Sequence, residues 1–166
     1  YHRSHTGQGQ LIDACMVESM LTVIPEALID FSLNGRELDR VGNKDKDKAP
    51  HDVFRCAGDD NWIAISVTND EQFQSLCRRI NHVELTNDSR FADKANRKRN
   101  QEDLRSYIEE WTSKRSHYEA MNGLQEAGVP AAATLNALEV IENPHFQERG
   151  FVSYPDHPVA GRRAIS

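Results

Sequence analysis

The sequence predicts an α+β fold in which a short antiparallel hairpin leads into amphipathic helices. Two runs rich in β-branched and aromatic residues, 53–54 and 62–67, flank a turn at 58–60, a pattern typical of a β-hairpin. Asn69 then precedes a run with apolar residues at helical spacing: Phe73, Leu76, Cys77 and Ile80. This spacing predicts a capped helix directly after the hairpin. The combination indicates neither a repeat protein nor an all-helical bundle.

Two more amphipathic helices are expected between residues 100 and 128. Asn100 stands as a cap before the first of them. The apolar stripe of that helix consists of Leu104, Tyr107, Ile108 and Trp111, and we expect it to face the core. Ser116 and Glu119 have the spacing of a capping box at the start of the second helix, which should end at Gly128.

Short elements are expected in the remaining residues. The segment 129–135 has the composition of a strand, and its proline suits the start of a strand or an edge position. Asn136 should cap a helix over 137–142, and Asn143 with Pro144 should start a last helical turn that ends at Gly150. Residues 151–154 and the final residues are expected to form a hairpin around 155–161.

The first third of the chain contains an apolar stretch from Leu11 to Leu33. Four acidic residues interrupt it, so a membrane span is not expected, because ionisable groups are costly inside a bilayer. The pattern predicts one long buried helix, kinked at Pro25 and ended by Asn34 and Gly35. Apolar residues fall on every face, which is typical of a helix with neighbours all round. We therefore expect that part of its natural partner lies outside this chain and that the helix drives self-association.

Composition and charge narrow the possible functions. With 166 residues, 38% of them hydrophobic and 28% charged, the chain is long enough for one domain with its own core. A net charge of −6 argues against a nucleic-acid or anionic-membrane surface, both of which require a basic face. The basic run 97–99 is expected to be a solvated helix face.

No catalytic or metal-binding pattern follows from residue chemistry alone. Cys15, Cys56 and Cys77 lie in apolar runs without a C-x-x-C pair, so we expect three buried, reduced thiols in a cytoplasmic protein and no metal site. No two histidines share the i, i+4 spacing with a glutamate that a metalloprotease needs. The residues by themselves indicate an α+β domain of a larger protein.

Five motifs in order nevertheless resemble a known family. They are TGQGQ at 6–10 with Ile12, Asp13 and Glu18; GN at 42–43 with AP at 49–50, FRC at 54–56 and WIAI at 62–65; RFA at 90–92 with Asn100, Leu104 and WT at 111–112; AGVPA at 127–131; and NPHF at 143–146 with RGF at 149–151. Together they make the whole chain similar to family III CoA-transferases, the group that includes formyl-CoA transferase, carnitine CoA-transferase and the α-methylacyl-CoA racemases.

The resemblance implies a domain organisation and a partner. Residues 1–41 would be the glycine-glutamine turn and the long interdomain helix, 42–154 the small α+β domain, and 155–166 the start of a return to a large domain. The family forms interlocked homodimers, and its nucleophilic aspartate would lie upstream of Tyr1. Asp13 does not match that position because it follows the glycine-glutamine turn. The 166 residues alone are therefore expected to be inactive.

The resemblance also implies site residues and substrates. The parent would use coenzyme A as an acyl-CoA substrate, with a carboxylic acid as acceptor and no metal. Met16 matches a CoA-contacting position, although a helix-packing methionine is an equally open interpretation. Gly42, Asn43, Lys48 and Ala49 would belong to a substrate loop. A glycine run of formyl-CoA transferase is replaced here by the charged residues 44–48, which disfavours oxalate or formate and favours a larger acyl group or another acceptor.

Three functions stay open at this point. The first is a transferase that moves CoA between carboxylic acids, and the second is an isomerase of the racemase branch, which abstracts a proton α to the thioester with an upstream His/Asp pair. The third is a non-catalytic interaction domain. The motifs at 42–43 and 49–50 favour the transferase over the racemase.

Overall fold

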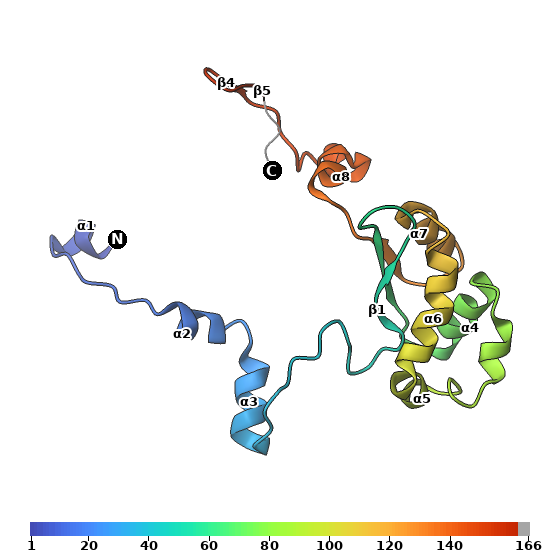
Figure 1. Ribbon diagram of the computed structural model, residues 1–166. Helices are drawn as coiled ribbons and strands as arrows, with labels where there is room; N and C mark the ends of the chain where they lie inside the picture. Colours follow the sequence, from blue (N-terminus) through green and yellow to red (C-terminus); the bar gives the residue numbers. More distant parts are fainter. Residues whose placement is uncertain (163–166) are drawn as a thin grey trace. The chain divides into compact units, whose positions relative to one another are not determined.

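A computed structural model describes residues 1–162 and divides the chain into two units, Tyr1–Gly42 and Asn43–Ser166. Figure 1 labels the elements of both units. The helices and strands, in chain order, are α1 (His2–Thr6), α2 (Met16–Leu21), α3 (Pro25–Asn34), β1 (His51–Arg55), β2 (Trp62–Ser66), α4 (Asp70–Arg79), η1 (Val83–Asn87), α5 (Lys94–Arg99), α6 (Gln101–Thr112), α7 (His117–Glu126), β3 (Ala131–Ala133), α8 (Ala137–Glu142), α9 (Pro144–Glu148), β4 (Asp156–His157) and β5 (Gly161–Arg162).

The first unit contains helices but no buried residue. The predicted single long helix is wrong, because residues 11–15 are not helical and α2 and α3 are separate. Ile24 leaves the helical region at φ −123° and ψ 51°, since a residue before proline is disfavoured there. Pro25 is then the first residue of a new helix, where its missing N–H costs no hydrogen bond. The predicted end is confirmed, with Gly35 at φ +63°.

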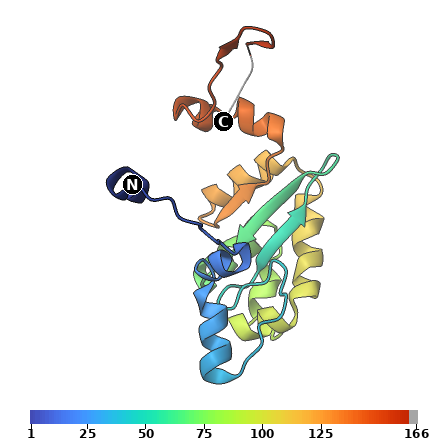
Figure 2. The same cartoon turned by 90° about the vertical axis from the view of Figure 1, so that its left-hand side faces the viewer.

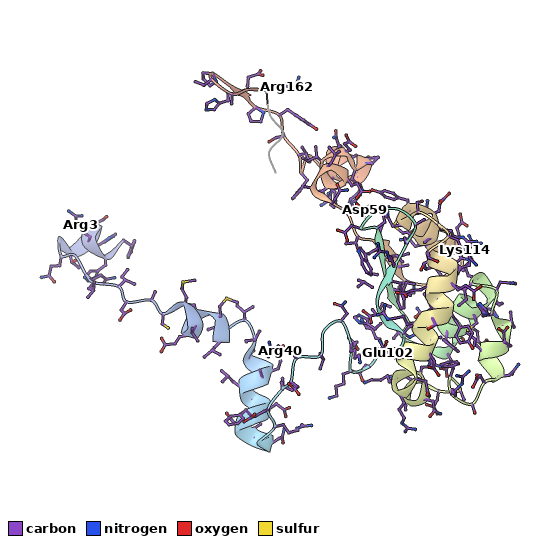
Figure 3. The ribbon with its side chains drawn as sticks, in the orientation of Figure 1. Arg3, Arg40, Asp59, Glu102, Lys114 and Arg162 are labelled. Carbon is purple, nitrogen blue, oxygen red and sulfur yellow. The ribbon has the colours of Figure 1, made fainter. Side chains whose placement is uncertain are left out.

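The apolar side chains of α2 and α3 are exposed, which agrees with the expectation that this stretch is not fully covered within one chain. Met16 is 83% exposed, Val17 69% and Phe31 55%. The side chains drawn in Figure 3 project from these helices without a second layer of the same unit over them.

The second unit is built on a three-stranded antiparallel sheet with the order β1-β2-β3. The predicted hairpin is confirmed: β1 pairs with β2 in a register that joins Phe54 to Ile63. Phe54, Ile63 and Ile65 share one face of the sheet and are at most 1% exposed. Because side chains alternate along a strand, Val53 and Ala64 lie on the opposite, half-open face.

Helices cover the closed face of this sheet, as both cartoon views show (Figures 1 and 2). α6 packs against β1, and α7 packs against β2 and β3. The predicted stripes are confirmed, since Leu104, Ile108 and Leu124 are fully buried. Charged residues occupy the outer side of α6, where Figure 3 labels Glu102 near its start and Lys114 beyond its end.

Local capping follows the sequence in most places. Asn69 accepts a hydrogen bond from the Gln72 amide, and complete capping boxes start α7 at Ser116 and α8 at Asn136. Asn100 is an exception and a correction: its side chain donates to the carbonyls of Arg90 and Asn96 and does not cap α6. Asn143 accepts from the His145 amide at the start of α9, as predicted.

The C-terminal hairpin is shifted relative to the prediction. Residues 151–154 do not form its first strand, because β4 consists of Asp156 and His157 and pairs with Gly161 and Arg162. Residues 163–166, which belong to the predicted segment 155–166, lie outside the described residues. None of the helices in residues 1–162 combines the length and apolar character that a bilayer-crossing segment needs.

Candidate functional site

The segment 43–50, which precedes β1, contains three of the predicted site residues and is fixed at its start by Asn43. The Asn43 side chain donates to Asp52 Oδ1 over 3.1 Å, and His51 Nδ1–H donates to the Asn43 carbonyl over 2.6 Å. Asn43 is thereby bound to the first two residues of β1. The first residue of this segment is therefore hydrogen-bonded to β1, the strand that follows the segment.

Asp52 is the charged centre of this end of the segment. Its carboxylate accepts from the Val53 amide over 2.8 Å, accepts from Asn43, and is ion-paired with Arg105 of α6. Burial acts to raise the pKa of Asp52, but the Val53 amide, Asn43 and the Arg105 charge together hold that pKa below its ordinary value. A carboxylate with all of these partners is an anchor and is poorly suited to act as a base.

Arg105 connects this anchor to the helical layer. One of its Nη atoms donates to the Val53 carbonyl over 3.0 Å and to Glu109 over 2.9 Å. Its guanidinium lies over the ring of Phe54, 5.1 Å from the centroid, an arrangement typical of a cation–π contact. Arg105 thus joins α6 to three consecutive residues of β1.

The other end of the segment is buried. Ala49 is 1% exposed, its amide donates to the Val67 carbonyl over 3.0 Å, and its own carbonyl accepts from Arg97 Nε over 3.2 Å. The peptide bond between Ala49 and Pro50 is cis. Between the two ends, Lys98 Nζ donates to the Lys46 carbonyl over 2.9 Å. The pKa of Asp45 is lowered, mainly because the Asp47 amide donates a hydrogen bond to its carboxylate.

A hollow of about 490 Å³ lies beside Asn43 and the start of β1. Its polar lining comes from Asn43, His51, Asp52, Ser66 and Gln125. Small and apolar residues of β1, β2 and β3 form the rest of the lining, among them Val53, Ala64 and Ala132. Its volume is that of an ordinary small-molecule pocket, which is typically apolar with a few polar groups.

The structure brings together some of the predicted site residues. Asn43 and Ala49 are held against the same sheet, and the half-buried Lys48 lies between them and near Asp45. Gly42 has a φ of +62°, which glycine adopts without strain. Met16 belongs to the first unit and is highly exposed, so its assignment to CoA stays a prediction.

The sequence did not predict the roles of Arg97 and Arg105, which contact Ala49 and Asp52. Arg97 is 1% exposed, so the prediction of a solvated face at 97–99 is wrong for this residue, although Lys98 and Arg99 are exposed. The signal for Asp52 was available: it alternates with Phe54, which puts a charge on the core side of a strand. Such a charge requires a partner from another element.

The two buried cysteines, Cys56 and Cys77, are not activated nucleophiles. Burial raises the pKa of Cys56 to about 11 and that of Cys77 to about 12. Cys15 is exposed, so the prediction that all three are buried is wrong for that residue. Within residues 1–162 there is no group of three or more His, Cys, Asp or Glu side chains placed to hold a metal ion.

The chain is similar to known proteins along its whole length. The family model described as CoA-transferase family III matches residues 1–165. The chain is 31% identical to a succinyl-CoA:mesaconate CoA-transferase of Haloarcula marismortui and covers 39% of that protein. It is 32% identical to an acetyl-CoA:oxalate CoA-transferase of Acetobacter aceti, with 96% of this chain and 42% of that protein covered.

Solved structures agree with this similarity. A CAIB/BAIF family protein from Brucella suis matches 98% of this chain and 45% of its own, with a TM-score of 0.82 and 27% identity. The chain spans about two fifths of the length of the curated relatives above. The similarity confirms the predicted α+β fold and the predicted resemblance to family III. The chain belongs to CoA-transferase family III.

Proposed function

We propose that these residues are the interdomain segment and small domain of an enzyme that moves coenzyme A between carboxylic acids. The observation that carries the proposal is the family match over residues 1–165, together with relatives whose names are those of CoA-transferases. The fixed segment 43–50 supports it, because a substrate loop requires a defined position beside the reacting groups. In this proposal Gly42, Asn43, Lys48 and Ala49 contact the acyl-CoA or the acid, and Met16 contacts CoA.

The nucleophile is proposed to be an aspartate outside this chain, upstream of Tyr1. Its carboxylate would attack the thioester carbonyl of the donor, which forms a mixed anhydride and releases the CoA thiolate. The thiolate would then attack the aspartyl carbonyl, which releases the donor acid and leaves an aspartyl-CoA thioester. The acceptor carboxylate would reverse both steps. Splitting an acyl transfer in this way is ordinary covalent catalysis.

The assembly is proposed to be an interlocked homodimer in the cytoplasm. The uncovered apolar side chains of α2 and α3 support a second chain as partner. The free cysteines, two of them buried, suit a reducing compartment.

The test is an assay on the full-length protein obtained by extending the reading frame. With succinyl-CoA as donor and a panel of acids (mesaconate, oxalate, malate and citramalate), chromatography should show a new acyl-CoA. Replacement of the upstream aspartate by alanine should abolish it. The racemase alternative predicts instead deuterium incorporation α to the thioester in D₂O without transfer. The 166-residue chain alone should show neither reaction, and transfer by that chain would contradict the upstream nucleophile.

A further inference from the structure

Arg97 stands out as a buried charge whose contacts join distant segments. It is 1% exposed, although it belongs to the short helix α5 at the surface. Each of its three guanidinium nitrogens has a different acceptor: Nε donates to the Ala49 carbonyl over 3.2 Å, Nη1 to the Phe91 carbonyl over 3.2 Å, and Nη2 to Asp70 over 2.6 Å. A buried cation requires such partners, because losing its hydration is costly.

The guanidinium plane is also fixed by packing. It lies over the ring of Phe73, 4.5 Å from the centroid. Asp70 and Phe73 both belong to α4, so the charge partner and the stacking partner come from the same helix. A lysine could not reproduce this contact set, because one ammonium has neither the fork geometry nor the planar face.

The contact with Ala49 has a consequence for the segment 43–50. Ala49 and Pro50 are bound on one side to Val67, the residue directly after β2, since the Ala49 amide donates to the Val67 carbonyl and the Val67 amide donates to the Pro50 carbonyl. Arg97 holds the Ala49 carbonyl on the other side. The C-terminal end of the segment is thus held between the sheet and the helical layer.

The N-terminal end has a parallel arrangement that uses a second arginine. Arg105 holds Asp52, and Asp52 accepts from the side chain of Asn43. The charged residues 44–48 lie between these two ends and contain no glycine. One further contact, from Lys98 to the Lys46 carbonyl, supports the middle.

We propose that Arg97 and Arg105 are positioning residues that fix the two ends of the segment 43–50. This inference rests on the proposed function in so far as the segment serves as the substrate loop. A glycine-rich loop is conformationally free, whereas the two arginines hold this segment in a defined position. Asn43, Lys48 and the main chain between them therefore have one fixed arrangement. Arg97 acts through the Ala49 carbonyl, and Arg105 acts through Asp52.

Amide hydrogen exchange on the 166-residue chain tests the clamp itself. Arg97→Lys should raise exchange of the Ala49 and Val67 amides about tenfold or more, because the donor to the Ala49 carbonyl is lost, and leave the α7 amides unchanged. Arg99→Lys is the matched control: it lies in the same helix, is exposed, and should change nothing. Arg105→Lys should raise exchange around Val53 in the same way.

A second variant keeps the test valid if Arg97→Lys does not fold. Asp70→Asn removes a charge partner whose side chain is 68% exposed, and it should raise exchange of the same two amides about threefold. Unchanged exchange of these amides in every folded variant would overturn the proposal. Equal increases in the segment and in α7 would also overturn it, because they would show a general loss of stability.

Steady-state kinetics of the full-length protein separate this inference from the proposed function. Arg97→Lys should lower kcat about tenfold and change KM for the acyl-CoA less than twofold, since a displaced loop affects the reacting geometry most. Altered loop exchange without CoA transfer by the unmodified protein would sink the proposed function and leave the clamp standing. CoA transfer by the unmodified protein, with unaltered loop exchange and unaltered kcat in the variant, would support the proposed function and overturn the clamp.

Discussion

The two units of this chain use apolar residues in different ways. Residues 1–42 contain a nearly continuous apolar stretch, yet none of them is buried. The second unit places its apolar residues on one stripe of each main helix and one face of the sheet, and buries Phe54, Ile63 and Leu104 completely or nearly so. Apolar content alone therefore does not make a core, because apolar side chains are buried only where other elements pack against them.

Thiol labelling should reveal the largest difference between the two units. At pH 8 a thiol with a pKa of about 11, like Cys56, is thiolate in only about one molecule in a thousand, and Cys77 in fewer still. We expect iodoacetamide to modify the exposed Cys15 at least about a thousandfold faster than either. Mass spectrometry of peptides would measure the rates. Equal labelling of all three in native buffer would contradict the described burial, and equal labelling in denaturant is the control.

Truncating one phenylalanine in each unit should separate them next. Phe54→Ala removes a core ring and should lower the free energy of unfolding by about 3–5 kcal/mol. Phe31→Ala, in the first unit and 55% exposed, should leave that free energy unchanged. Both tryptophans, Trp62 and Trp111, lie in the second unit, so their fluorescence during urea unfolding reports on its stability alone. A similar loss in both variants would show that the units fold as one.

Self-association should depend on the first unit. Replacing Val23 and Phe31, which are 67% and 55% exposed, by glutamate should weaken association of the 166-residue chain about a hundredfold. Leu138→Glu is the matched control, because Leu138 is 60% exposed in α8 of the second unit. Sedimentation velocity over a concentration series would measure the effect. A strict monomer before any substitution would count against the expected role of this surface.

The smallest expected effect concerns the carboxylates and pH. The folded-state pKa of Asp52 is lowered, so its charged form stabilises the fold above its unfolded pKa of about 3.9, and this contribution disappears as the pH falls through the folded pKa. Asp52→Asn should therefore cost about 1–2 kcal/mol at pH 7, and the difference from the unmodified chain should shrink below about pH 4. Urea unfolding at pH 7 and pH 3 would measure it.

Asp30→Asn is the control for that experiment in the first unit. Asp30 pairs with Arg36 over 2.8 Å, but the Arg36 side chain is 65% exposed. The substitution should leave the tryptophan-detected unfolding curve unchanged at both pH values. A pH-independent cost of Asp52→Asn would show that lost packing, and not charge, explains its effect.

Local sequence signals predicted the elements of the second unit well. The hairpin, α4, α6 and α7 follow from residue alternation, helical spacing and caps such as Asn69 and Ser116, all of which act within a few residues. They failed where a neighbouring element competes. Asn100 has the composition of a cap, but its side chain donates to the carbonyls of Arg90 and Asn96. In the first unit the failure has a local cause: Pro25 was expected to kink a helix and instead begins one, because the residue before a proline is disfavoured in the helical region.

The sequence by itself determined the fold class and the family, because these depend on periodicity and on motifs in fixed order. The tertiary structure alone decided how the segment 43–50 is held. Arg97 lies in a basic run that any sequence pattern assigns to solvent, and its burial depends on acceptors that lie 48, 27 and 6 positions away in the chain. No local rule encodes such contacts, since a buried charge is tolerated only where several distant acceptors meet in space.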